Sequence, residues 1–232
     1  MGTTSTDIWE KQYIEKGFKS QRLYPNEELL RFMGSNFFGI PYRKRRRIRI
    51  LEIGCGSGAN LWMIAKEGFR AFGIDMSKEG LRLCSEMLKH WQVSANIVNG
   101  NILSLPYEDN YFDVVVDIVT MQHTTFSQHI KIYPEIKRVL KPGGRFFSYH
   151  QGNKSYLYRH GGGKIIDKFT IDDVRNPKAP LRKVGVYCLP TEKAIKEMIE
   201  RSGFKNVNIE NVIKTYNNRS IKIQYLVINA QK

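Results

Sequence analysis

Apolar residues between positions 48 and 150 follow two alternating spacings. Segments between the apolar runs place residues such as Leu81, Cys84 and Leu88 on one face of a helix. The runs themselves are short and nearly continuous, as expected for strands buried on both faces of a sheet. They predict strands at 48–53, 70–75, 95–98, 113–119 and 145–150. Strands that alternate with helices predict a doubly wound, mostly parallel sheet with helices on both faces.

The segments on either side of this core have different patterns. Residues 7–33 carry helical spacings with a break at Pro25, which predicts two N-terminal helices. Residues 151–186 show no periodicity and are rich in glycine and proline, which is typical of a long connection used as a lid or binding loop. After Pro190 the pattern predicts a helix and an antiparallel strand pair with a turn at 216–219.

These patterns predict a single domain over residues 1–232. Its expected parts are an N-terminal helical cap at 1–42, a cofactor-binding core at 48–150, an irregular substrate loop or lid at 151–190, and a C-terminal helix with an antiparallel strand pair at 191–232. A chain of 232 residues with 41% hydrophobic residues is long enough for one well-buried α/β domain. No N-terminal signal peptide and no apolar run of membrane-spanning length is evident, so we expect a soluble, cytoplasmic protein.

Charge and cysteine content narrow the class of partner. The formal net charge of +15 favours anionic partners such as nucleic acids or phosphorylated metabolites. The basic run at 43–47 suits an anion patch, although it lacks the aromatic residues of a stacking platform, so a solvated loop is favoured. The 3 cysteines have no paired spacing, so neither a disulfide framework nor a metal site is predicted.

The glycine-rich turn after the first strand is the candidate binding site. Gly54, Gly56 and Ala59, with Asp75 at the end of the second strand, fit a dinucleotide-binding fingerprint. Glu52 argues against it, because a carboxylate at this position would repel a pyrophosphate and suits a cationic group. The chain also leaves no second domain for a hydride acceptor. A dinucleotide enzyme therefore stays a distant alternative.

Further stretches place this turn in a wider context. In order along the chain they resemble the motifs of class I S-adenosylmethionine-dependent methyltransferases, at residues 51–58, 73–77, 105–107, 111–113 and 137–144. The resemblance covers residues 48–150. From Pro190 onward, only the order of the predicted helix and strands resembles the family. It implies a Rossmann-like sheet of seven strands with an antiparallel last strand. It also implies S-adenosyl-L-methionine as the cofactor and S-adenosyl-L-homocysteine as the product.

The same resemblance implies roles for individual residues. The glycines of the turn would let the backbone approach the cofactor, Glu52 would support its amino end, Asp75 would accept from both ribose hydroxyls, and Asn101 would border the adenine. The family often has aspartate where this chain has Asn101, so we expect some loss of affinity and no loss of the site. The full set of candidate cofactor residues is Tyr13, Glu52, Gly54, Cys55, Gly56, Gly58, Asp75, Met76, Asn101, Ile102 and Asp117.

Methyl transfer requires in-line placement of a nucleophile, and an oxygen nucleophile or a protonated amine also needs a base. His123, in the loop after the fourth strand, is the catalytic candidate. The alternative is that His123 only orients this loop. His150 is the second candidate, and Tyr24, Tyr149 and Tyr156 are candidate substrate contacts together with it.

The sequence constrains the methyl acceptor less than it constrains the cofactor. No Asn-Pro-Pro-Tyr-like tetrad follows the fourth strand, and no added RNA-binding domain is evident. We therefore expect methylation of an oxygen or nitrogen of a small anionic metabolite. An RNA or protein methyltransferase that uses the basic surface is the first alternative. A non-catalytic, cofactor-binding partner protein is the second.

Overall fold

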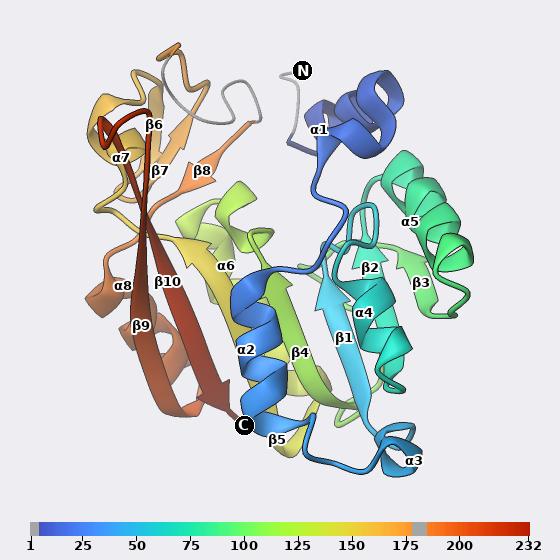
Figure 1. The fold of residues 1–232 in the computed structure, drawn as a ribbon. Helices are drawn as coiled ribbons and strands as arrows, with labels where there is room; N and C mark the ends of the chain where they lie inside the picture. The colour runs from blue at the N-terminus through green and yellow to red at the C-terminus, as the bar shows by residue number, and fades with distance from the viewer. Residues whose placement is uncertain (1–4, 178–184) are drawn as a thin grey trace.

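The computed structural model describes residues 5–177 and 185–232, and its strands form a seven-stranded sheet in the order β3-β2-β1-β4-β5-β10-β9 (Figure 1). Strands β1 to β5 pair in parallel, whereas β10 is antiparallel to both β5 and β9. The strands are β1 Arg49–Ile53, β2 Arg70–Asp75, β3 Asn96–Asn99, β4 Phe112–Ile118, β5 Leu140–Gln151, β9 Lys205–Tyr216 and β10 Ile221–Gln231. The predicted fold class is confirmed.

Helices cover both faces of this sheet (Figure 1). Ile50 faces a core shared with α2 (Glu27–Asn36), α4 (Leu61–Lys66) and α5 (Lys78–His90). Its neighbour Leu51 faces the opposite core, shared with α6 (Phe126–Val139) and α8 (Glu192–Arg201). This alternation is the period of a strand buried on both sides, which explains the continuous apolar runs in the sequence. No helix within residues 5–177 and 185–232 has the length and apolarity needed to cross a bilayer.

The stretch expected to be irregular contains regular elements. These are α7 (Tyr156–His160) and the strands β6 (Lys164–Asp167), β7 (Thr170–Asp172) and β8 (Tyr187–Cys188), which form a separate three-stranded sheet. Strands this short leave no alternation for a sequence pattern to reveal. Residues 178–184 of the expected lid lie outside the described residues. The division into cap, core, lid and tail stays a prediction.

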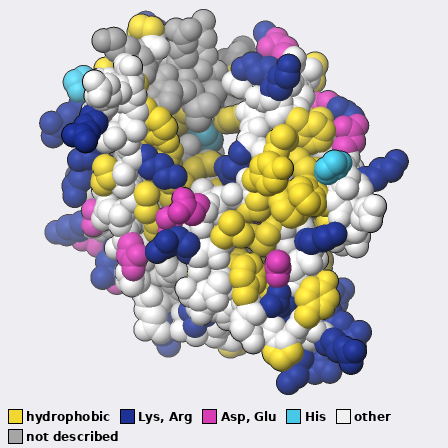
Figure 2. Space-filling model, in the orientation of Figure 1, with side chains coloured by type: hydrophobic (Ala, Val, Ile, Leu, Met, Phe, Trp, Pro, Cys, Tyr) yellow, Lys and Arg dark blue, Asp and Glu magenta, His cyan; other side chains and the backbone are white. Residues whose placement is uncertain are grey.

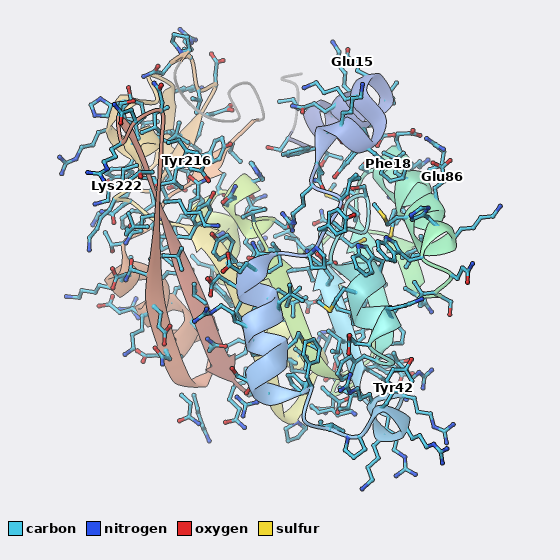
Figure 3. The ribbon with its side chains drawn as sticks, viewed as in Figure 1. Glu15, Phe18, Tyr42, Glu86, Tyr216 and Lys222 are labelled. Atoms are coloured by element: carbon cyan, nitrogen blue, oxygen red, sulfur yellow. The ribbon has the colours of Figure 1, made fainter. Side chains whose placement is uncertain are left out.

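The N-terminal segment lies over the carboxyl end of the sheet (Figure 1). It consists of α1 (Ser5–Lys16) and the 3-10 turn η1 (Gly17–Ser20). The Glu10 carboxylate accepts hydrogen bonds from the Ser77 hydroxyl at 2.5 Å and from the Glu79 backbone N–H at 3.2 Å. These groups begin α5, where a negative charge is favourable. The labelled Phe18 and Glu86 in Figure 3 mark where this segment lies beside α5.

The residues of the basic run at 43–47 differ in burial. Arg45, in the short helix α3 (Tyr42–Arg45), is buried; it donates to the carbonyls of Phe38 at 2.6 Å and Ile40 at 2.9 Å and pairs with Glu67 at 2.5 Å. Arg46 and Arg47 are exposed. Because α3 precedes β1, it lies at the amino end of the sheet, where Tyr42 is labelled in Figure 3 and basic side chains gather in Figure 2. The run therefore lies at the opposite end of the sheet from the turn that follows β1.

Arg45→Ala should lower the free energy of unfolding by about 2–4 kcal/mol, because it leaves buried carbonyls without donors. Arg46→Ala is the matched control and should change it by less than about 0.5 kcal/mol. Urea denaturation followed by circular dichroism measures both values. Equal effects of the two substitutions would contradict the structural role of Arg45.

Candidate functional site

A cavity of about 880 Å³ opens at the carboxyl ends of β1, β2 and β4. The chain leaves β1 toward α4 on one face of the sheet and leaves β4 toward α6 on the other, so a crevice forms between the two strands. The N-terminal segment contributes Trp9, Tyr13 and Arg22 to its wall, and the stretch before β8 contributes Val186. Segments far apart in the sequence therefore enclose one space.

The turn after β1, residues 54–58, is the glycine loop, and its backbone passes close to its neighbours. Gly54 has a φ of +66°, and a Cβ there would lie 2.1 Å from Cγ2 of Thr120. Gly58 has a φ of +83°, and a Cβ there would lie 2.7 Å from Sγ of Cys84. Both positions combine a left-handed conformation with a close approach, so they require glycine. The loop leads directly into α4.

Glu52 is buried at the end of β1 with one of its oxygens unpaired. Its Oε1 accepts from Nδ2 of Asn60 at 2.5 Å, whereas its Oε2 is buried without a hydrogen-bond partner among the described residues. The Asn60 side chain is held in place because its Oδ1 accepts from the backbone N–H of Asn26 at 2.9 Å. Burial raises the pKa of Glu52 to about 8. A cationic group in the cavity would restore its charge.

Asp75 ends β2 on the other side of the glycine loop. Its Oδ2 accepts from the Gly56 N–H at 2.8 Å and its Oδ1 from the Ser77 N–H at 2.9 Å. Burial raises the pKa of Asp75, although both N–H groups act in the opposite direction. Each oxygen keeps acceptor capacity for a hydroxyl group. Asn101 lines the same cavity, and its Oδ1 accepts from the Leu103 N–H at 2.9 Å.

His123 lies at the end of η2 (Met121–His123) and lines the cavity. Its Nδ1–H donates to the Val186 carbonyl at 3.2 Å, which leaves Nε2 as an acceptor. Gln122 Oε1 lies 3.4 Å from the Gln151 N–H, so its Nε2 amide, 3.3 Å from His123 Nε2, is the donor of that pair. Burial lowers the pKa of His123 to about 4, so the ring is neutral at pH 7.

Asp117 shapes the loop that carries His123. It is buried, and its Oδ1 accepts from the backbone N–H groups of Thr120 and Met121, each at 3.0 Å. Its Oδ2 accepts from the Ser148 hydroxyl at 2.6 Å. Val119, in the turn between Asp117 and Thr120, has a φ of +60°, which is rare for a β-branched residue. The carboxylate holds this turn, and burial raises its pKa to about 6.

A family model described as a methyltransferase domain matches residues 51–148, which include the glycine loop, Glu52 and Asp75. Over this stretch the chain belongs to the class I S-adenosylmethionine-dependent methyltransferases. S-adenosylmethionine is the cofactor of this family, so the expected family and cofactor are confirmed.

This chain is similar to curated relatives over more than the matched stretch. It is 26% identical over 214 residues to a sterol 4-C-methyltransferase of Caenorhabditis elegans, covering 91% of this chain and 57% of the relative. It is 30% identical over 167 residues to phosphoethanolamine N-methyltransferase 2 of the same organism, covering 70% of this chain and 34% of the relative. The chain therefore spans 57% and 34% of the length of these two curated relatives. A SAM-dependent methyltransferase structure from Methanosarcina mazei has a TM-score of 0.66 at 26% identity, covering 79% of this chain and 92% of that chain.

The structure brings most of the candidate cofactor residues together. Tyr13, Glu52, Gly54, Cys55, Asp75, Met76, Asn101 and Ile102 line the cavity, as does His123. Three other candidates stand behind this wall. Gly56 lies under the Tyr13 hydroxyl, Gly58 packs on Cys84, and Asp117 bonds its own loop.

The four candidate substrate contacts are not in the cavity wall, which corrects their expected placement. Tyr149 lies on the face of the sheet that α2, α4 and α5 cover. It stacks on Tyr225 with ring centroids 4.3 Å apart. Tyr24 packs edge-on against Trp62 and Trp91 on the outer surface.

The other two candidates, His150 and Tyr156, contact protein groups outside the cavity wall. His150 is buried, and its Nδ1–H donates to the Gln151 carbonyl at 2.7 Å. Tyr156 stacks on His160 with ring centroids 4.5 Å apart. Proximity of a strand end to the site does not decide which way alternate side chains face.

Several wall residues have no signal in the sequence pattern. Arg22 and Lys19 lie in a short connection without periodicity, and Val186 contributes a backbone carbonyl, which no side-chain motif can reveal. Asn60 follows the glycine loop directly and had the best chance of being found. The wall residues that the sequence analysis missed include Trp9, Lys19, Arg22, Asn60, Gln122 and Val186.

His123 should titrate with a midpoint near pH 4, because Trp9 and Tyr187 enclose its half-buried ring and disfavour a charge. The Cε1–Hε1 signal in two-dimensional NMR measures this midpoint, and a His123→Gln variant assigns the signal. A midpoint near 6.5, the ordinary histidine value, would contradict the enclosed geometry.

Proposed function

We propose that this protein transfers a methyl group from S-adenosylmethionine to an oxygen or nitrogen of a small anionic metabolite. The observation that carries the proposal is the unpaired, buried Oε2 of Glu52 in the same cavity as Asp75. A buried carboxylate without a partner is costly, and a bound ammonium group removes that cost. A ligand with an amino acid group next to a ribose would supply an ammonium group for Glu52 and two hydroxyls for Asp75.

The cavity residues fit the parts of this cofactor. Glu52 would hold the ammonium group, and the remaining acceptor capacity of Asp75 would take the ribose hydroxyls. The half-exposed Met76 and the buried Ile102 would contact the adenine. The Asn101 oxygen already accepts from Leu103, so its amide group keeps donors for the adenine ring. This supports the expected binding site despite the departure from aspartate.

When bound, the cofactor supplies a methyl group on a positively charged sulfur that leaves as a neutral thioether. The protein residues then act mainly by placing the acceptor in line and excluding water. Trp9 and Tyr187 enclose His123 edge-on, with ring centroids 5.3 Å and 4.9 Å from the imidazole. This apolar enclosure keeps the histidine neutral.

We infer that His123 accepts a hydrogen bond from the acceptor group. Its Nε2 lone pair accepts from the Gln122 amide, and that amide is the group a substrate would displace. A pKa near 4 makes this histidine a weak proton acceptor. The proposed role is therefore orientation of a hydroxyl or amine, with the proton passing on to solvent after transfer.

Two cations support an anionic substrate. Arg22 and Lys19 both line the cavity and are exposed to solvent, and the charge of Arg22 acts on Glu52. One relative is named for phosphoethanolamine, an anionic amine, whereas another is named for a sterol. The cations favour the charged class for this chain. The exposed arginines of the basic run lie at the opposite end of the sheet, which weighs against a nucleic acid acceptor.

Purified protein with methyl-labelled S-adenosylmethionine should label compounds in an extract of small anionic metabolites. S-adenosylhomocysteine should raise the melting temperature and NAD should leave it unchanged. Asp75→Ala should abolish binding of S-adenosylmethionine in calorimetry, because the ribose hydroxyls and the Gly56 N–H lose their acceptor. Unchanged affinity would contradict the site, and binding without any labelled product would favour the non-catalytic alternative.

Binding of S-adenosylmethionine should release about one proton at pH 7, because Glu52, with a pKa of about 8 in the empty cavity, must ionise to hold an ammonium group. A raised carboxyl pKa means that affinity rises as pH rises, by up to about tenfold per pH unit below pH 8. Calorimetry in buffers of different ionisation enthalpy measures the released proton. Glu52→Gln should abolish the release and the exposed Glu15→Gln should keep it; an unchanged release in Glu52→Gln would assign it to another group.

A further inference from the structure

Behind His123 lies a cluster of three buried side chains that the proposed reaction does not use. His129 comes from α6, His150 from β5 and Cys188 from β8, and all three have no exposed surface. One nitrogen of each histidine and the sulfur of the cysteine all lie within 4.8 Å of one another. The cluster therefore joins two elements of the core to the small sheet.

The hydrogen bonds on the outer side of the two rings determine their tautomers. His129 Nε2–H donates to the Met121 carbonyl at 3.1 Å, and His150 Nδ1–H donates to the Gln151 carbonyl at 2.7 Å. The other ring nitrogens, Nδ1 of His129 and Nε2 of His150, are therefore unprotonated. Both are buried without a hydrogen-bond partner among the described residues. Two buried lone pairs without a donor are unfavourable unless a cation or a donor joins them.

The third side chain of the cluster is oriented as well. Cys188 has a hydrogen bond with the Thr170 side chain. The Thr170 oxygen accepts from the Phe126 N–H at 2.9 Å, so its hydroxyl hydrogen is free to point at the sulfur. Each of the three candidate ligand side chains thus has a hydrogen bond that orients it.

We propose that His129, His150 and Cys188 bind a thiophilic d10 metal ion, Zn²⁺ or Cu⁺. Two neutral imidazoles and a thiolate are preferred ligands of these ions, and outer hydrogen bonds to carbonyls are typical of metal-binding histidines. On binding, the S–H bond of Cys188 breaks, its proton goes to solvent, and the sulfur and both nitrogens donate electron pairs to the ion. No oxidation or reduction is involved.

The ion would act as a structural link beside the cavity. Cys188 follows Val186, whose carbonyl orients His123, and His129 holds the carbonyl of Met121, the first residue of η2. A bond from β8 to α6 and β5 would therefore attach the small sheet to the core and fix the position of His123. Within the small sheet of the described residues, β8 is an edge strand that pairs with the short strand β7.

Metal analysis of the purified chain, dialysed against Zn²⁺ or against Cu⁺ under reducing conditions, tests the site. We expect about one ion per chain and a higher melting temperature than in chelator-treated protein. Cys188→Ser and His150→Gln should lose the ion and the temperature shift, whereas the exposed His90→Gln should keep both. The ion that is retained identifies the metal.

Cobalt substitution of the unaltered chain keeps the proposal testable if the variants do not fold. Co²⁺ bound to the cysteine should give a near-ultraviolet sulfur-to-metal absorption band that thiol alkylation prevents. Limited proteolysis should cut the segment around β6 to β8 faster after chelation. Absence of retained metal, of the cobalt band and of any chelator effect would overturn the proposal and favour a buried water molecule in the cluster.

Discussion

The burial of the Glu52 carboxyl at the end of β1 constrains the whole cavity. A carboxyl in this position needs a donor, and Asn60 supplies it from the residue before α4. Asn60 in turn accepts from Asn26, the residue that caps α2. This one chain of hydrogen bonds connects the glycine loop, the first strand and the N-terminal helices. Its unpaired end, Oε2, is the part left for a ligand.

A second buried carboxyl organises the opposite wall. Asp117 ends β4 and holds the turn through Val119 and Thr120 that leads into η2. Thr120 also donates to the Gly54 carbonyl at 3.2 Å, so the two loops support each other across the crevice. The strained turn directs His123 toward the cavity. Its geometry depends on polar groups that are satisfied inside the protein, which keeps the wall rigid.

The small sheet connects this wall to the rest of the molecule. Val186 and Tyr187 contact His123, and the adjacent Cys188 reaches the histidine cluster behind it. The same short strand thus serves the proposed acceptor site on one side and the proposed metal site on the other. Gain or loss of an ion there would be felt at His123 without any direct contact with a substrate.

Much of the core followed from local patterns in the sequence. Continuous apolar runs, glycines at forced turns and the acidic residues Glu52 and Asp75 predicted the strands, the fold class, the family and most of the candidate cofactor residues, because each is a property of residues near one another in the chain. Tertiary structure decided which way Tyr149 and His150 face, and it buried Arg45 within a run that looks solvated. It also decided that Val186, Arg22 and Asn60 meet at the cavity and that His129, His150 and Cys188 meet behind it. Such contacts join distant segments, and no local pattern encodes the direction in which their side chains point.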